Sequence, residues 1–587
     1  TQASKPLPAE KRIRTPALLF AMSGDPSPKR LKHDWGQGDL YLGFDISTQS
    51  CKALVVDGSL AIVGVSRVHY DTDLPQHGTQ DGCHRGEGGR VTSPTLMWVE
   101  AVELALDRLK AQGCPFDRIT AISGSGQQHG SVYWTRSGVE ALRGLDPTSG
   151  RVAEQLKGAF AVAASPIWMD TSTTASCKAL TELAGDAMHV ADWTGSTAQE
   201  RFTGHHFRRF IADHGLASIA ALSLVSSLGA SLLTGNIMPV DISDAAGMNL
   251  MDIRSKRWHE RLVEFVAPGE AAALRAVLPE PQDSWGLCGK VHNFWVQRYG
   301  FSSECRVVAW SGDNPCAVVG NGLVQEGDIA ISLGTSDTAL SVIPRVPAAP
   351  LPFGHLFPHP ILKGCYWSML CYTNGDVTRR KVRDEFFPEG SDSTAAWEGF
   401  SQALKDTPPG NSSSVGMFFT TDEITPAVSC GADFRGRRRG KGASLETMDS
   451  FDNPKQNARA VIEMRAMAIR NHLEKLMPGI LARTGADAPQ LLLTGGASSN
   501  VDILQVFADV FQRPVRCMEN TEGAAFGAAV RALHGVKPEF ASDIFAKLRS
   551  LSSIRAQPTS ASAVAYLELA ETYAALEAKA LSERGRL

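Results

Sequence analysis

Short apolar runs and one helical repeat follow each other over residues 40–123. The expected elements are strands at 40–45, 53–57 and 62–68, a helix marked by Trp98, Val102, Leu106 and Leu109, and a strand at 119–123. A polar turn at 47–50 separates the first two strands. A hairpin meander followed by a helical crossover is typical of an α/β domain.

A strand, a Ser/Thr-rich turn and a second strand recur after residue 328. The expected elements are strands at 328–333 and 338–342 around a polar turn at 334–337, a long helix with an apolar face from Ala458 to Leu476, a strand at 491–493, a helix at 501–511, a strand at 514–516 and a helix at 522–533. We therefore expect two α/β domains, each opening with a hairpin. Two such hairpins facing across a cleft would hold a polyphosphate from both sides.

The segment 215–240 carries no charged side chain and is long enough to suggest a membrane-spanning helix. It also contains five serines, together with Gly229 and Gly235, so its hydrophobicity is weak for a lipid-facing helix. We expect a helix buried inside the protein and no membrane partner.

Composition narrows the functional classes. The chain has 587 residues, of which 43% are hydrophobic and 20% charged, values typical of a soluble protein with two or three domains. Its 58 Lys and Arg against 62 Asp and Glu lack the basic excess of a dedicated nucleic-acid-binding protein. Its 11 cysteines form no CxxC pair, so neither a zinc site nor a disulfide framework is expected. These features indicate a reduced, cytoplasmic protein that binds no nucleic acid.

Two glycine-rich segments resemble nucleotide-binding motifs but do not meet their requirements. Residues 436–442 are similar to a P-loop, yet the spacing is one residue short and no Ser or Thr follows Lys441. A basic surface loop (435–441) is the better interpretation. Residues 124–130 begin like a dinucleotide fingerprint, but they continue into a strand at 131–134 instead of a helix.

Asp45 ends the first expected strand, beside a turn of Ser47, Thr48, Gln49 and Ser50. A carboxylate at that point can hold hydrated Mg²⁺, which prefers one or two carboxylates together with phosphate oxygens. The hydroxyls and amides of the turn can receive phosphate. Taken alone, the segment fits an aspartate that caps its own turn equally well.

Asp313 and Asn314 follow the expected strand at 306–309. Such a pair suits a hydroxyl substrate, because the aspartate accepts the proton and the asparagine orients the sugar. Gln128 and His129 would supply amide and imidazole hydrogen bonds to a polyol. Each segment, taken alone, also fits a structural turn or a buried hydrogen-bond network.

Six short motifs occur in a fixed order along the chain. They are GFDISTQ at 43–49, SGSGQQHG at 123–130, ERFTG at 200–204, SGDNP at 311–315, SLGTSDT at 332–338 and LTGGASSN at 493–500. In this order they resemble the FGGY family of carbohydrate kinases, and within it the eukaryotic xylulose kinases. The resemblance runs from about residue 40 to roughly the last 40 residues. It implies an α/β fold of duplicated actin-like (ribonuclease-H-like) domains flanking a central cleft.

The resemblance also implies a domain division and a set of site residues. The division is a flexible leader at 1–38, a domain for sugar and phosphate at 39–325, a nucleotide-binding domain at 326–545 and a helical tail at 546–587. Asp313 resembles the catalytic base, and the implied sugar-binding residues are Gln128, His129, Arg201, Asp313 and Asn314. The implied ATP contacts are Thr48, Gln49, Gly334, Thr335, Trp397, Gly495, Gly496 and Asn500, with Asp45 positioning Mg²⁺ through water. Gly43, Gly312, Gly334, Gly495 and Gly496 are expected where backbone meets phosphate, sugar or adenosine.

The implied reaction is transfer of the γ-phosphate of ATP to the 5-hydroxyl of D-xylulose, with Mg²⁺, by a monomer or homodimer. The chain departs from many family members after Trp168-Met169-Asp170, where no Arg follows, and this counts against Asp170 as a sugar ligand. From the residues alone, two alternatives stay open. One is a kinase for another ketose or polyol, such as ribulose, glycerol, gluconate or sedoheptulose. The other is a non-kinase actin-like nucleotide-binding protein or a sugar sensor.

Overall fold

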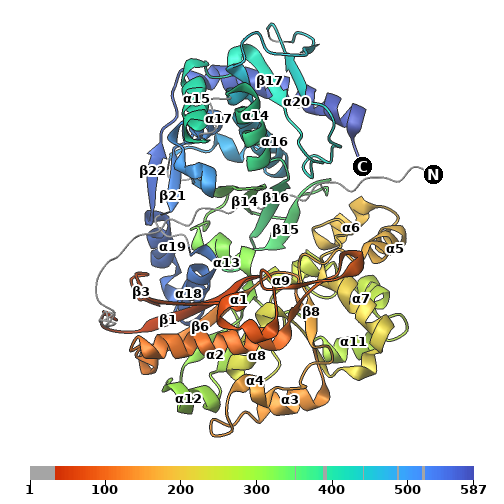
Figure 1. Ribbon diagram of the computed structural model, residues 1–587, viewed down its shortest axis with the longest axis vertical. Helices are drawn as coiled ribbons and strands as arrows, with labels where there is room; N and C mark the ends of the chain where they lie inside the picture. The colour runs from red at the N-terminus through yellow and green to blue at the C-terminus, as the bar shows by residue number, and fades with distance from the viewer. Residues whose placement is uncertain are drawn as a thin grey trace, which may run out of the picture.

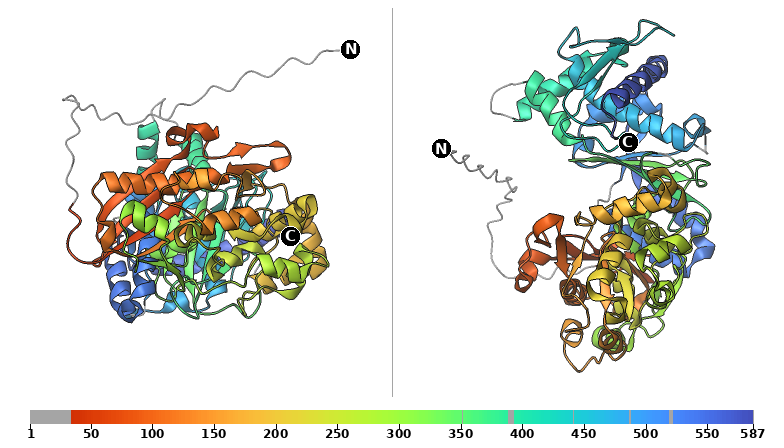
Figure 2. Two further views of the ribbon diagram at one scale, coloured as in Figure 1. Left: turned by 90° about the horizontal axis from the view of Figure 1, so that it is seen from below. Right: turned by 90° about the vertical axis from the view of Figure 1, so that its right-hand side faces the viewer.

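The structure, a computed structural model, describes residues 34–350, 352–387, 393–440, 442–485, 488–518 and 522–586. Two α/β lobes are stacked along the long axis of the molecule, and each is built around one large mixed sheet (Figure 1). The right-hand view of Figure 2 shows the same two lobes one above the other. Most of the expected leader, residues 1–33, lies outside the described residues.

The first lobe contains a mixed sheet centred on β1 and β6. Its order is β10 (Leu287–Lys290), β11 (Arg306–Val308), β6 (Ile119–Gly126), β1 (Leu40–Ile46), β2 (Ser50–Asp57) and β3 (Ile62–His69), with β12 (Ser311–Gly312) also beside β6. β1 pairs antiparallel with β2 and parallel with β6. Every residue of β1 is buried, because the strand has neighbours on both sides and helices over both faces.

The second lobe repeats this arrangement. Its sheet has the order β15 (His355–Pro358), β16 (Tyr366–Tyr372), β14 (Asp337–Ile343), β13 (Ile329–Leu333), β20 (Leu491–Thr494), β21 (Val515–Met518) and β22 (Ser552–Ala556). β13 pairs antiparallel with β14 and parallel with β20, as β1 does with β2 and β6. The duplicated α/β fold predicted from the motifs is therefore confirmed.

Helices cover the faces of the two sheets. In the first half of the chain the main ones are α2 (Thr95–Ala111), α3 (Arg136–Arg143), α5 (Thr174–Ala184), α6 (Ala187–Thr194), α7 (Thr203–His214), α8 (Val225–Thr234), α12 (Asn293–Tyr299) and α13 (Asp313–Gly320). In the second half they are α14 (Asp376–Phe386), α15 (Ser393–Asp406), α16 (Gln456–Leu476), α17 (Val501–Phe511), α18 (Gly523–Val536), α19 (Ala541–Ser550) and α20 (Ser562–Arg584). α13 lies between the lobes, with α14 to α17 and α20 above it (Figure 1).

Helix α18 belongs to the first lobe in space although it comes late in the sequence. It packs so closely on β1 that a Cβ on Gly43 would lie 2.1 Å from the Ala525 carbonyl oxygen and 2.4 Å from the Ala529 nitrogen. Gly43 therefore serves helix packing, and the expectation that its backbone meets phosphate is wrong. The region expected as a helical tail also contributes a strand, because β22 pairs with β21.

The uncharged segment 215–240 is buried, but it is not one helix. It forms the short strand β9 (Ala221–Leu224) and then α8. β9 pairs antiparallel with β7 (Ser131–Trp134), and Ser223 accepts a hydrogen bond from the Trp134 indole at 3.1 Å. Among the helices of the described ranges, none is long and apolar enough to cross a membrane.

Two further expectations need correction. Helix α16 has no single apolar face, because residues 456–469 are buried on all sides. The charged side chains of that stretch are paired, Arg459 with Glu463 and Arg465 with Asp337 of β14. The expected basic loop at 435–441 lies partly in β18 (Phe434–Arg437), and Lys441 falls outside the described residues. Arg437 and Arg439 both pair with Glu446, so acidic partners offset the basic run.

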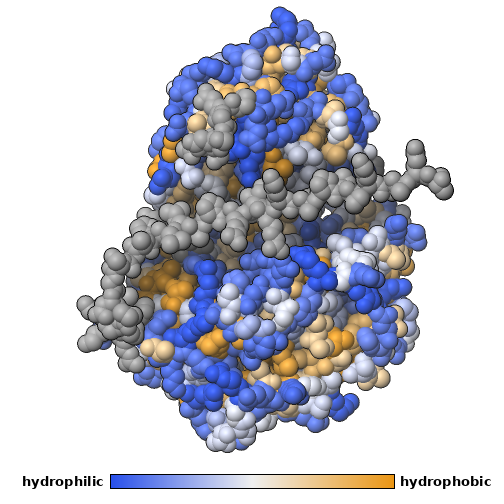
Figure 3. Space-filling model, in the orientation of Figure 1, coloured by the Kyte–Doolittle hydropathy of each residue, from blue (hydrophilic) through white to orange (hydrophobic). Residues whose placement is uncertain are grey.

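The face seen in Figure 3 is mostly hydrophilic, with hydrophobic positions scattered among polar ones on both lobes. All 11 cysteines are free thiols.

Candidate active site

Asp45 lies at the end of β1, where the first hairpin turns. Its carboxylate accepts hydrogen bonds from the hydroxyls of Ser47 at 3.1 Å and Ser125 at 2.9 Å. The Lys52 ammonium lies 3.9 Å away, but it is closer to Glu522, at 2.8 Å. Burial raises the pKa of Asp45 above its ordinary value, against the opposing effect of Lys52. This carboxylate is held mainly by hydroxyls, and its one ammonium neighbour, Lys52, is shared with Glu522.

The turn that follows Asp45 borders an open cavity of about 480 Å³. The cavity is lined by residues 47–50 with Asp81, Arg85, Trp168 and Met169. Thr48 accepts a hydrogen bond from the Trp168 indole at 2.9 Å, and Gln49 is exposed. The turn therefore has both a fixed hydroxyl and room beside it for a polar ligand.

Asp313 and Asn314 start helix α13, at the end of β12. The Asn314 side-chain amide donates to Oδ1 of Asp313 at 3.0 Å and to Oε1 of Gln128 at 2.9 Å. Burial raises the pKa of Asp313 to about 7, and the charge of nearby Asp45 adds to the rise. The structure thus brings together three of the residues expected to bind sugar, Gln128, Asn314 and Asp313.

His129 is held in one orientation and one protonation state. Its backbone is left-handed (φ +69°), its ring stacks on Phe202 with centroids 4.6 Å apart, and Nδ1 lies 2.8 Å from the Gly247 carbonyl oxygen. Burial lowers the pKa of His129 well below its ordinary value, and the charge of Arg201 adds to the fall. Because a carbonyl only accepts, Nδ1 carries the proton, and Nε2 of the neutral ring is an acceptor for a hydroxyl.

A buried acidic pair supports the Gln128 side chain from behind. Gln128 donates to Oδ1 of Asp244 at 3.4 Å, and Ser226 donates to Oδ2 at 2.5 Å. Burial and the charge of Asp241 raise the pKa of Asp244. Asp241 accepts from Ser311 at 3.0 Å and lies 3.8 Å from Arg531 of α18. Sequence reasoning missed this pair, and the only signal for it was the spacing of two aspartates beside an uncharged segment.

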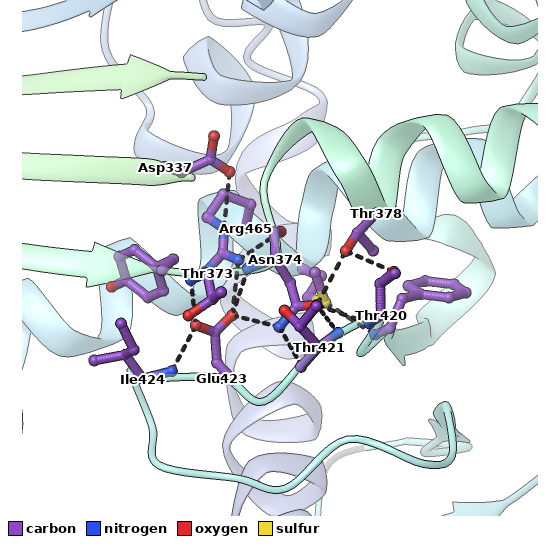
Figure 4. Close-up of polar contacts among 12 residues, drawn as sticks. Asp337, Thr373, Asn374, Thr378, Thr420, Thr421, Glu423, Ile424 and Arg465 are labelled. Carbon is purple, nitrogen blue, oxygen red and sulfur yellow. Dashed lines mark hydrogen bonds and ion pairs between the residues drawn. The ribbon is translucent and has the colours of Figure 1, made fainter. Parts of the chain in front are cut away.

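The second hairpin turn, residues 334–336, is held by groups from α14. The Gly334 carbonyl oxygen accepts from the Asp376 backbone at 2.8 Å and from the Arg379 guanidinium at 3.0 Å. Thr335 is exposed, whereas the next aspartate, Asp337, is fully buried. Figure 4 shows Asp337 directed toward Arg465. Sequence reasoning missed both arginines, because nothing in their local pattern indicates burial.

The expected adenosine contacts lie at the end of β20 and on α15. A Cβ on Gly495 (φ +85°) would lie 2.6 Å from the Leu333 carbonyl oxygen, whereas one on Gly496 would meet nothing within 4 Å. Asn500 caps α17 and donates to Ser401 of α15 at 2.8 Å. Trp397 lies one helical turn before Ser401, and the Arg383 guanidinium lies 4.9 Å from its ring. Gly496 therefore leaves open space, while Gly495 and Asn500 have structural partners of their own.

Asp170 makes its contacts within the first lobe. It accepts from the Val91 backbone at 3.0 Å and from the Ser172 backbone at 2.9 Å. Each carboxylate oxygen thus accepts one backbone N–H, so Asp170 supports the chain around Val91 and Ser172.

Two duplicated lobes, each opening with a hairpin turn, and a buried aspartate at the start of a helix between them are typical of the two-lobed class with the actin-like fold. Residues 161–320 match the N-terminal domain and residues 329–536 the C-terminal domain of the FGGY family of carbohydrate kinases. The chain belongs to this family and is a carbohydrate kinase.

Several relatives match most of the chain. Xylulose kinase 2 of Arabidopsis thaliana is 42% identical over 507 residues, which cover 84% of this chain and 87% of that protein. Xylulose kinase of Mus musculus is 40% identical over 552 residues, covering 93% of this chain and 95% of that protein. Among solved structures, xylulose kinase from Rhodospirillum rubrum has a TM-score of 0.71 at 19% identity, covering 93% of this chain and 99% of that one. The last likeness supports the fold alone.

Proposed function

We propose that the chain phosphorylates D-xylulose on its 5-hydroxyl, with ATP as phosphate donor and Asp313 as general base. The observation that carries the proposal is the Asp313–Asn314–Gln128 cluster, in which the carboxylate is oriented by an amide and has a pKa near 7. A general base works best when its pKa lies near the operating pH. The xylulose kinases that resemble the chain over most of its length support the choice of sugar.

The chain's own residues would align the hydroxyl and remove its proton. Asn314 holds Oδ1 of Asp313, and the carboxylate takes the proton as the hydroxyl attacks the γ-phosphate. His129 would accept a second hydroxyl at Nε2, and Arg201 lies close enough to affect the pKa of His129. A polar group fixed against each hydroxyl discriminates strongly between sugars, because a wrong sugar leaves a buried polar group unpaired.

The residues around the first hairpin fit a hydrated Mg²⁺. Asp45 supplies one carboxylate, held by hydroxyls, and this ion commonly takes its remaining ligands from water and phosphate. Within the described ranges, no group of three or more His, Cys, Asp and Glu side chains could hold a metal, so one carboxylate with phosphate oxygens is the better fit. When bound, the ion would neutralise charge on the phosphates. Thr48 and Gln49 of the first turn, Gly334 and Thr335 of the second, and Gly495, Gly496, Asn500 and Trp397 would contact ATP.

We also propose that the enzyme acts in the cytoplasm. Its 11 free thiols suit a reducing compartment.

ADP release measured across D-xylulose, D-ribulose, glycerol, D-gluconate and sedoheptulose tests the proposal. We expect the highest kcat/KM with D-xylulose, and a product whose phosphorus couples to the protons on C5. If another polyol gives a higher kcat/KM, that polyol is the substrate and D-xylulose is not. ATP hydrolysis at the same rate with and without sugar would favour an actin-like nucleotide-binding protein instead.

A further inference from the structure

Two buried arginines converge on the aspartate that follows the second hairpin turn. Asp337 is the first residue of β14, and none of its surface is exposed. It comes directly after the turn that we propose binds ATP phosphates. An ionised carboxylate in that place would repel the phosphates unless its charge were neutralised.

Arg379 of α14 connects both ends of the turn. Its guanidinium binds the two carboxylate oxygens of Asp337 at 2.8 and 3.0 Å, and it donates to the Gly334 carbonyl oxygen at 3.0 Å. Only 3% of the arginine is exposed. The planar guanidinium fork makes all three bonds at once, which a lysine ammonium cannot reproduce.

Arg465 of α16 holds the same carboxylate from a second helix. Its Nε donates to Asp337 at 3.1 Å, and its Nη2 donates to the Asn374 carbonyl oxygen at 2.9 Å and to Glu423 at 3.1 Å. Figure 4 shows Arg465 between Asp337 and Glu423. Glu423 in turn accepts from the backbone of Thr373 at 2.6 Å, just before α14 begins.

The charges in this group balance, since two guanidinium groups face two carboxylates. Buried ion pairs add little to stability compared with apolar side chains of similar size, because desolvation offsets their attraction. Stability alone is therefore a weak explanation for the group. Its contacts converge on the turn instead. The residue before α14, Gly375, also packs directly on the turn, since a Cβ there would lie 2.6 Å from the Thr335 carbonyl oxygen.

We propose that Arg379, held in place by Asp337 and Arg465, is a positioning residue that sets the 334–336 turn for the phosphates of ATP. The inference rests on the proposed function in taking ATP as the ligand of this turn. It assigns Arg379 no contact with substrate. It predicts a defect confined to the nucleotide, because the sugar-binding cluster lies at the start of α13 and in the loop after β6, outside the sheet and helices that hold Arg379.

Arg379→Lys is the direct test, and calorimetric titration of Mg–ATP and of D-xylulose, each alone, is the readout. We expect ATP affinity to fall about tenfold, the scale of losing one or two charge-assisted hydrogen bonds, with D-xylulose affinity unchanged. Gly375→Ala disturbs the same turn without changing any charge, and it should give the same split. If Arg379→Lys does not fold, Gly375→Ala still tests the role of the turn in ATP binding.

Arg459→Lys is the matched control. Arg459 is a buried arginine on α16 that binds Glu463, Tyr566 and the Leu404 carbonyl oxygen, away from the turn. Its variant should bind ATP normally even if it melts at a lower temperature. Normal ATP affinity in both turn variants, equal losses for ATP and sugar, or the same ATP loss in Arg459→Lys would overturn the inference.

The sugar panel separates this result from the proposed function. A wild type that binds ATP but phosphorylates none of the sugars would end the proposed function, while the ATP affinities of the variants would still decide the role of Arg379. A wild type that binds no ATP would overturn both.

Discussion

The β1–β2 hairpin and the β13–β14 hairpin each present a Ser/Thr-rich turn beside an aspartate, yet the two aspartates have different neighbours. Asp45 is held by two hydroxyls, with its nearest ammonium 3.9 Å away. Asp337 is enclosed by two guanidinium groups at 2.8 to 3.1 Å. The two hairpins share one sequence pattern, but hydroxyls are the nearest partners of Asp45, whereas guanidinium groups are the nearest partners of Asp337.

The difference separates the tasks of the two hairpins. A carboxylate held mainly by hydroxyls, with its nearest ammonium 3.9 Å away, can still take a metal ion, as at Asp45. A carboxylate already bound by arginines offers nothing to a metal, but it anchors the turn beside it and leaves the backbone of that turn to face phosphate. We infer that the aspartate of the first hairpin binds Mg²⁺, whereas the aspartate of the second supports a turn that binds phosphate oxygens.

The largest effect expected from this comparison is on metal use. Asp45→Asn removes the carboxylate but keeps its size, so kcat should fall about 10²-fold or more and the Mg²⁺ concentration for half-maximal rate should rise. Initial rates over a Mg²⁺ titration measure both. Asp337→Asn should leave that Mg²⁺ concentration unchanged, and a matching rise in this variant would erase the distinction between the hairpins.

The next effect is on stability, where the Asp337 variant is expected to lose more than the Asp45 variant. Asp337→Asn takes the carboxylate away from Arg379 and leaves Arg465 with Glu423 alone, and breaking a buried pair in this way costs about 3–5 kcal/mol in the free energy of unfolding. Asp45→Asn should cost nothing, because burial raises the pKa of Asp45 and its ionised form destabilises the fold above the ordinary carboxyl pKa. Urea unfolding of both variants gives the comparison, and equal losses would contradict it.

The smallest effect is on the pH profile. Asp313 must be ionised to act as a base, so kcat/KM for D-xylulose should fall as pH drops through about 7 in the wild type. Asp45→Asn removes a like charge, and the residual activity should persist to lower pH. The shift is partial, because burial is the larger cause of the raised pKa of Asp313. A profile that moves to higher pH would show that Asp45 does not act on Asp313 in this way.

Much of the fold could be predicted because its signals are local. The apolar runs that form β1 and β13 and the polar turns after them lie within a few residues of each other, so the duplicated hairpins are visible in the pattern alone. Asp313 and Asn314 are adjacent in the chain, and their pairing at the start of α13 needs no distant contact.

Contacts between distant segments were not predictable in this way. Arg379 and Arg465 lie 42 and 128 residues beyond Asp337, and an arginine within a helix usually indicates an exposed face. Gly43 was expected to meet phosphate, but its neighbour is α18, a helix nearly 500 residues later that tertiary packing alone brings to β1. The burial of the charged residues of α16 was not predictable for the same reason, because it depends on partners from other elements.

The central claim is that Asp313 is the base of a sugar kinase, and Asp313→Asn tests it most directly. Asparagine has the same shape but cannot take the proton. We expect calorimetry to give nearly wild-type affinities for D-xylulose and Mg–ATP, and rapid-quench single turnover to give a phosphorylation rate lower by about 10²–10⁴-fold. A variant that binds both substrates and phosphorylates D-xylulose at the wild-type rate would contradict the account.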